Sequence, residues 1–346
     1  MRHSSSSLQP PPTASILGTE SAEALDTFFE RLQSVRAEIN RNSKLIRRFI
    51  DDSALIKRTE DASAPGHATS TAFSLYYLLR GNEPHDVTSS IRGVSKDDLL
   101  NATRQLGKSI ETGHVRRDSD GNETSTGELP NQYNSTIQVA GFLKASRILG
   151  SEVVASQATA CQTVISFVSE IMSRTAGYVP RLETDAQSAY LSYWAGAAIL
   201  EWKLYRDERG GNDTTGQDPD ELLSRLSDWS EGQVARYIAF HYSGLKSRFD
   251  VIELLYSAIC TVAFRHSPDA EEVARHALDV IFDGYFADGC LAPSAPVLAD
   301  KENFALQCPT LGLLLLVTTT LPLKHADRLC STHEWLARNR SRSRVV

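Results

Sequence analysis

Residues 67–77 read HATSTAFSLYY, and residues 184–194 read TDAQSAYLSYW. Each stretch begins with small polar residues and carries aromatic residues one or two turns further along. Few charges interrupt either stretch, which is typical of helices that are buried on all sides. We therefore expect both stretches to begin interior helices of one repeated helical arrangement.

Two kinds of helix alternate along the rest of the chain. Helices poor in charge are predicted to begin near residues 67, 133, 184, 248 and 301. Helices with one charged face are predicted to begin near residues 95, 151, 220, 269 and 323. Strand signals are nearly absent, and residues 113–131 and 207–218 are interpreted as long polar loops. The pattern predicts an all-α protein with a buried and a half-exposed set of helices.

The composition is that of a folded protein with short flexible ends. Hydrophobic residues make up 41% of the 346 residues and charged residues 23%, which is close to the globular average. We expect one helical domain over residues 20–338. Residues 1–19, with a serine run and three consecutive prolines, are expected to form a disordered arm. Residues 339–346 are expected to form a basic, flexible tail.

Charge, apolar runs and cysteine usage indicate which partners and which cellular compartment to expect. The formal charge of −7 is spread thinly and the basic residues are interspersed with acidic ones, so nucleic acid is not expected. The apolar run 311–317 is too short to span a bilayer, so no membrane insertion is expected. Five cysteines stand far apart, and no charged-then-apolar leader opens the chain, which favours a cytoplasmic protein.

The predicted architecture resembles the α/α-toroid superfamily, in which inner and outer helices form a barrel. Terpenoid cyclases, protein prenyltransferase β-subunits and several carbohydrate enzymes share this fold. The resemblance covers residues from roughly 24 to 338 and is architectural. It implies a closed toroid around a central cavity. An open solenoid of helical hairpins has the same alternation and is the alternative.

The catalytic signatures of that superfamily are missing from the sequence. Neither an Asp-x-Asp-Asp run nor an Asp-Asp-x-x-Asp run is present. Asp288-Gly289-Cys290 resembles a zinc-ligand triplet of prenyltransferase β-subunits, but the next expected helix has no histidine to complete the site. An ordinary turn is the alternative interpretation of Asp288-Gly289. We expect no metal and no other cofactor.

The candidate site lies where the inner helices begin. If these helices run in one direction, their amino-terminal ends meet at one mouth of the barrel, where the helix dipoles favour anionic groups. The candidate acid/base residues are Asp185, Asp250 and Glu253. The candidate ligand-binding residues are His67, Tyr133, Asn134, Gln187, Tyr190, Trp194 and Arg248. Helix capping is the alternative role for Asn134, Asp185 and Asp250.

Asp250 and Glu253 are three residues apart and would share a helix face. Such a pair can raise the proton affinity of one carboxyl group and so provide acid/base chemistry. Neutralisation by Arg248 or another basic side chain is the alternative.

Two functions follow from this interpretation. The first is a toroid that binds a small or extended ligand with an anionic group in its central cavity, and the resemblance implies a terpenoid-cyclase- or prenyltransferase-like enzyme. The second is a non-catalytic helical scaffold that binds a protein or peptide. The sequence does not decide whether the ligand is transformed.

Overall fold

The structure is a computed structural model. It describes residues 54–55, 66–79, 84, 90–91, 94–117, 123–125, 132–181, 186–210, 217–243, 251–264, 268–284, 286–287 and 290–291. Eight helices and four short β-hairpins make up this described part. The prediction of a mostly helical, all-α protein is confirmed. Both terminal segments and the helices expected from 301 and 323 lie outside the described residues.

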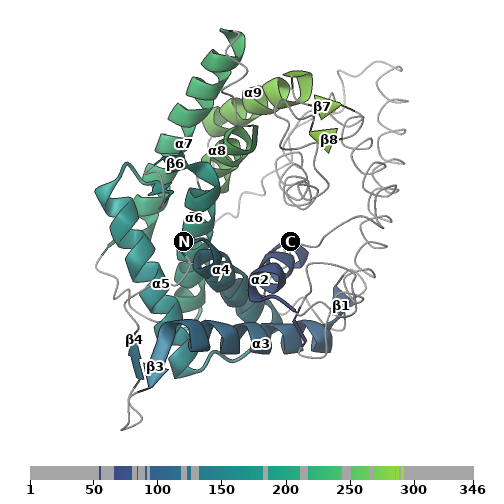
Figure 1. Ribbon diagram of the computed structural model, residues 1–346, viewed down its shortest axis with the longest axis vertical. Helices are drawn as coiled ribbons and strands as arrows, with labels where there is room; N and C mark the ends of the chain where they lie inside the picture. Colours follow the sequence, from purple (N-terminus) through teal and green to yellow (C-terminus); the bar gives the residue numbers. More distant parts are fainter. Residues whose placement is uncertain are drawn as a thin grey trace, which may run out of the picture.

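Four helices form the concave, inner layer of the described part (Figure 1). They are α2 (Ala68–Leu78), α4 (Gln132–Leu149), α6 (Ala189–Asp207) and α8 (Val251–Ala263). Each packs against the next inner helix along the chain. These are the helices with few charges, and α2 is buried over nearly its whole length.

The other four helices form the convex, outer layer (Figure 1). They are α3 (Lys96–His114), α5 (Ala155–Arg174), α7 (Pro219–Tyr242) and α9 (Pro268–Gly284). Their starts follow ordinary capping chemistry. The Ser95 hydroxyl accepts the Asp98 N–H at 3.1 Å, and the Asp218 carboxylate accepts the Asp220 N–H at 2.9 Å. Each cap satisfies a backbone donor that the first helical turn leaves free.

The inner helices run parallel to one another, as three sets of contacts show. Between α2 and α4, Gln138 donates to Thr69 at 3.2 Å, and Lys144 lies over the Tyr76 ring further along both helices. Between α6 and α8, Ala189 contacts Glu253 in the first turns and Tyr193 contacts Tyr256 one turn later. Lys144 and Arg147 of α4 contact Glu201 and Glu208 of α6 in the same order. The amino-terminal ends of all four helices therefore face the same side of the layer.

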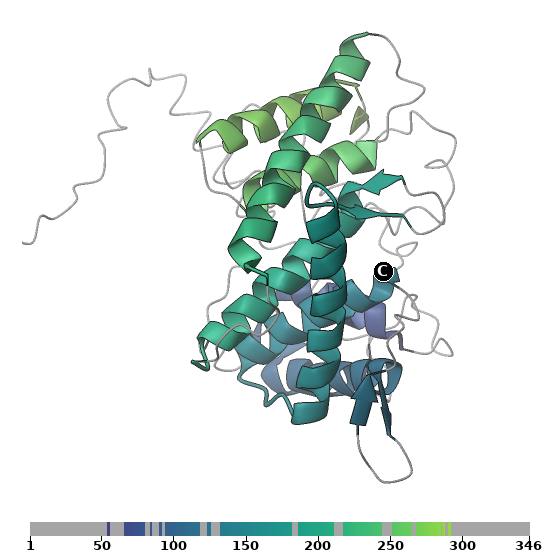
Figure 2. The ribbon, with the colours of Figure 1, turned by 90° about the vertical axis from the view of Figure 1, so that its left-hand side faces the viewer.

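Short antiparallel hairpins connect several helices. They are β1 (Ser90–Ile91) with β2 (Val94–Ser95), β3 (Val115–Arg117) with β4 (Glu123–Ser125), β5 (Val179–Pro180) with β6 (Gln187–Ser188), and β7 (Phe286–Ala287) with β8 (Cys290–Leu291). The segment interpreted as a long polar loop over 113–131 contains the end of α3 and the short strands β3 and β4, which the sequence pattern did not predict. Figure 2 shows the hairpins β3–β4 and β5–β6 on one side of the helical layers. These two hairpins lead from an outer helix into the next inner helix.

Helix α6 begins later than the sequence pattern predicted. A start near 184 was expected, but Gln187 and Ser188 are extended and pair with β5. The helix starts at Ala189, with Ser188 as the N-cap residue accepting the Leu191 N–H. Gln187 therefore lies in strand β6 rather than in the first turn of the helix. Pairing with β5 holds this segment in the extended conformation.

None of the helices in the described part of the chain combines the length and the apolar composition that crossing a bilayer requires.

Candidate functional site

Glu253, in the first turn of α8, joins three elements at the amino-terminal ends of the inner helices. The residue is buried, with 5% of its surface exposed. Its Oε1 atom accepts from the Arg181 guanidinium at 2.8 Å and from the Ser188 hydroxyl at 2.9 Å. Its Oε2 atom accepts the Ala189 N–H. This carboxylate fastens the β5–β6 hairpin and the start of α6 to α8.

The partners of Glu253 determine which kind of ligand group could bind at this end of the inner layer. Arg181 neutralises the carboxylate, as one of the two interpretations of the Asp250 and Glu253 pair anticipated. Its side chain remains 47% exposed and places a guanidinium beside parallel helix amino termini. Both features favour an anionic ligand group. Sequence reasoning missed Arg181, because it stands in a hairpin that no strand signal marked.

Replacing Glu253 by glutamine is expected to loosen the β5–β6 hairpin. The amide keeps the size of the side chain but loses the ion pair with Arg181, which costs about 1–2 kcal/mol of unfolding free energy. Hydrogen exchange measured by mass spectrometry should speed up in peptides that cover residues 179–189. Glu272→Gln, on the exposed face of α9, is the control and should leave that exchange unchanged. Equal exchange in both variants would contradict the anchoring role.

The other predicted residues are placed as follows. His67 is at the N-cap position of α2 without a side-chain cap bond. Asn134 is half-buried in the first turn of α4, inside the helix rather than at its cap. Gln187 is exposed and accepts from Gln233 at 3.0 Å. Tyr133 belongs to the first turn of α4, although its side chain is not described, and Asp185, Arg248 and Asp250 lie outside the described residues.

Tyr190 and Trp194 belong to a group of packed rings that we call the aromatic cluster. Its members are Phe73, Tyr76, Tyr77, Tyr190, Tyr193, Trp194 and Tyr256. The ring centroids of Tyr76 and Trp194 are 5.2 Å apart, and those of Tyr190 and Tyr256 are 4.8 Å apart. The cluster joins α2, α6 and α8, and Tyr77 and Tyr190 are its partly exposed members. The structure thus brings two predicted residues together with five further rings.

The sequence contained a signal for this cluster. The two quoted stretches end in the aromatic pairs Tyr76-Tyr77 and Tyr193-Trp194, at matching positions of the repeat. In the structure the two pairs meet, since both Tyr76 and Tyr77 have their rings against Trp194. Matching positions of parallel inner helices lie at the same depth, so the repeat itself predicts such a layer of rings.

Burial keeps the phenols of the cluster protonated. It raises the pKa of Tyr190 to about 12 and raises the pKa values of Tyr76 and Tyr256 well above the ordinary range. Removing a phenate from water is unfavourable, so these groups stay neutral at physiological pH. They offer apolar surface and neutral hydrogen-bonding groups to a ligand, and they do not act as bases there.

A second buried charged group lies nearer the carboxyl-terminal ends of α4 and α6. Glu201 is 1% exposed and accepts from Lys144 at 2.8 Å and from Arg147 at 3.2 Å. Arg147 also contacts Glu208 at 3.1 Å. The sequence signal for this group was that Lys144 and Arg147 are the only charged residues of α4 and have the opposite sign to Glu201 of α6. Its four charges neutralise one another and hold α4 against α6.

Comparisons with known proteins returned no match. No family model, no curated protein and no solved structure matches this chain. The candidate site consists of Arg181 and Glu253 at the amino-terminal ends of the inner helices. The aromatic cluster lies one turn deeper.

Proposed function

We propose that the protein is an α/α toroid that binds a small or extended molecule between its inner helices. The anionic group of the ligand lies at the amino-terminal ends of those helices, and its apolar part lies against the aromatic cluster. The single observation that supports this most is the parallel packing of four inner helices above a shared layer of rings. The proposal places the protein in the cytoplasm, where the buried thiols of Cys161 and Cys260 stay reduced.

The electrostatics at this end support the anionic half of the ligand. Four helix amino termini on one side contribute partial positive charge through the aligned dipoles of their peptide groups. The half-exposed guanidinium of Arg181 adds N–H donors in a planar arrangement that fits a carboxylate or a phosphate. Glu253 offsets part of that charge but is itself buried behind Arg181 and Ser188.

The chemistry of the cluster supports the apolar half. Aromatic side chains offer large apolar surfaces at low conformational cost, and small-molecule sites are lined mainly by such groups. Tyr77 and Tyr190 leave part of their surface uncovered, next to fully buried Trp194. A ligand that covers these two rings would also change the surroundings of the indole.

Farnesyl diphosphate, an isoprenoid chain with an anionic head, is a suitable probe for the proposal. Titration into the full chain is expected to quench tryptophan fluorescence, because Trp194 lies within the cluster. Tyr190→Ala should weaken binding at least about tenfold through lost apolar contact. Tyr178→Ala is the matched control, since Tyr178 is also half-buried but stacks on Trp229 of the outer layer.

The fluorescence signal has its own control on the same helix. Trp194→Phe should remove the quenching, while Trp202→Phe, equally buried but stacked on Tyr205 near the other end of α6, should retain it. Native mass spectrometry of the purified chain provides an independent search for a retained small molecule. Absence of both quenching and a retained molecule would refute the proposal.

We extend the proposal to a terpenoid-cyclase- or prenyltransferase-like enzyme that uses acid/base chemistry. Asp185 and Asp250 precede α6 and α8 in the chain and remain the acid/base candidates beside Glu253. Under this extension, Asp185→Asn and Asp250→Asn abolish turnover of a bound isoprenoid. If both variants behave like the parent chain, these residues are not the catalytic groups.

A non-catalytic scaffold for a protein or peptide is the second candidate. One observation favours it: Tyr242, at the end of α7, is 76% exposed. In that helix no residue beyond Val234 is buried. Large exposed aromatic side chains are enriched at protein interfaces. Binding of a protein partner that is lost in Tyr242→Ser, without any small-molecule binding, would favour this candidate.

A further inference from the structure

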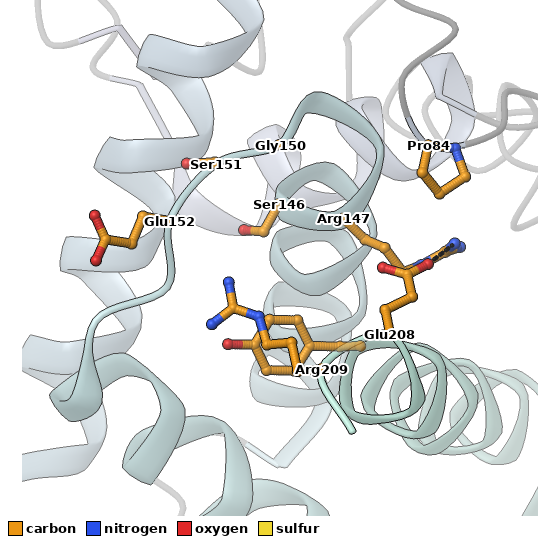
Figure 3. A pocket seen from close by; sticks show the side chains of 9 residues that line it. Pro84, Ser146, Arg147, Gly150, Ser151, Glu152, Glu208 and Arg209 are labelled. Atoms are coloured by element: carbon orange, nitrogen blue, oxygen red, sulfur yellow. Dashed lines mark hydrogen bonds and ion pairs between the residues drawn. The ribbon is translucent and has the colours of Figure 1, made fainter. Parts of the chain in front are cut away.

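A pocket lies at the carboxyl-terminal ends of two inner helices, away from the site proposed above (Figure 3). It has a volume of about 570 Å³ and is formed by the ends of α4 and α6 and by the connection to α5. This volume falls within the range of small-molecule sites. The lining is rich in polar and charged side chains, among them Ser146, Arg147, Glu152, Glu208 and Arg209.

Ser146 provides a buried polar group aimed into this pocket. Only 2% of the residue is exposed, and its hydroxyl has no hydrogen-bond partner among the described residues. Its backbone carbonyl is already used, since it accepts the Ser151 N–H at 2.9 Å. A buried hydroxyl without a partner is unfavourable, so native proteins rarely keep one without a reason. Figure 3 shows this hydroxyl facing the space bordered by Ser151, Glu152 and Arg209.

Some charged side chains of the pocket form ion pairs with other residues of the protein, and others do not. Arg147 is occupied by Glu201 and Glu208, so these three are not available to a ligand. Arg209 and Glu152 form no ion pair with any described residue. The Arg209 guanidinium stacks on the Tyr205 ring at 4.5 Å. Stacking occupies the face of the guanidinium and leaves its N–H donors at the edge for an acceptor.

The unused groups are complementary to a molecule that carries both charges. The guanidinium fits a carboxylate, and the Glu152 carboxylate fits an ammonium group. Two helix carboxyl termini end at this pocket and favour a positive group over a bare anion. The Ser146 hydroxyl can donate to the carboxylate or accept from the ammonium. We propose that this pocket binds a free α-amino acid, with its carboxylate on Arg209 and its ammonium group on Glu152.

The test is calorimetric titration of the full chain with each standard amino acid at up to millimolar concentration. At least one amino acid is expected to bind, and its N-acetylated form and its amide, which each lack one charge, are expected to bind at least about tenfold more weakly. Arg209→Gln and Glu152→Gln should weaken binding by a similar factor. Arg206→Gln is the matched control from the last turn of α6, three residues before Arg209, because Arg206 lies over Trp202 instead.

Ser146→Ala separates a ligand contact from a structural role. If the hydroxyl serves the ligand, this variant binds more weakly while the melting temperature of the free chain stays the same or rises. A fall in that temperature together with unchanged binding would overturn the role of Ser146. The whole proposal is overturned if no amino acid binds, if Arg209→Gln binds normally, or if the N-acetylated form binds as well as the free amino acid. None of these outcomes depends on the isoprenoid site at the other end of the helices.

Discussion

Gly141→Ala is expected to lower the unfolding free energy by at least about 3 kcal/mol, a large effect for one methyl group. A Cβ atom at this position of α4 would lie 2.6 Å from the Ala72 Cα atom and closer still to the Ala72 carbonyl oxygen. Both atoms belong to the backbone of α2, so no side chain can turn aside to make room. The two helices would have to separate, and urea unfolding should report a lower midpoint.

Gly232→Ala is the matched control for this variant. Gly232 lies within α7, and a Cβ atom at this position would meet nothing within 4 Å apart from its own turn of the helix. Alanine has the higher helix propensity, so this change should raise the unfolding free energy by about 0.5–1 kcal/mol. Opposite signs from the same chemical substitution would isolate the close approach of α2 and α4. A Gly141→Ala variant as stable as the parent would contradict that approach.

Glu201→Gln is expected to destabilise the protein by about 3 kcal/mol, because it leaves the largely covered cations of Lys144 and Arg147 without their shared carboxylate. The effect is at the low end for a broken buried pair, since Arg147 keeps Glu208 as a partner. Chemical unfolding followed by circular dichroism gives the measurement. Glu170→Gln removes an exposed ion pair with Arg174 and should change the unfolding free energy by less than about 0.5 kcal/mol.

A triple variant with Leu at 201 and Met at 144 and 147 distinguishes burial of charge from loss of packing. Apolar residues of similar size remove all three charges together, and such replacements are often neutral or stabilising. Stability near that of the parent is therefore expected. If the triple variant is as unstable as Glu201→Gln, the shape of these side chains matters more than their charge.

The helices were predictable because the helical spacing of apolar residues can be recognised within a single short segment of sequence. Helix α3 was expected to begin near residue 95 and begins at Lys96, and α4 was expected to begin near residue 133 and begins at Gln132. The β-hairpins were not predictable, since strands of two or three residues are too short to show a period of two. Segment 184–188 illustrates this limit. Its sequence pattern is typical of a helix start, but Gln187 pairs with Pro180 and is therefore part of a β-strand.

The candidate site was predictable in part. Tyr190 and Trp194 were chosen for their depth in an inner helix, and that depth places them among the rings of neighbouring helices. The partners of Glu253 were not predictable, because Arg181 lies 72 positions away in the chain and only the folded structure brings it close. Glu201 with Lys144, 57 positions apart, is a pair of the same kind. Charge pairing across distant segments depends on the orientation of whole helices, which one sequence does not reveal.

The order of the inner layer also bears on how the chain acquires its structure. Helix α2 packs on α4, α4 on α6, and α6 on α8. Each inner helix therefore contacts the inner helix that is synthesised next. Proteins built from stacked helical units fold by nucleation and propagation, and their stability is close to a sum over neighbouring units. We expect that, in a nascent chain halted after α6, helices α2 and α4 already resist protease, before helices α7, α8 and α9 are synthesised.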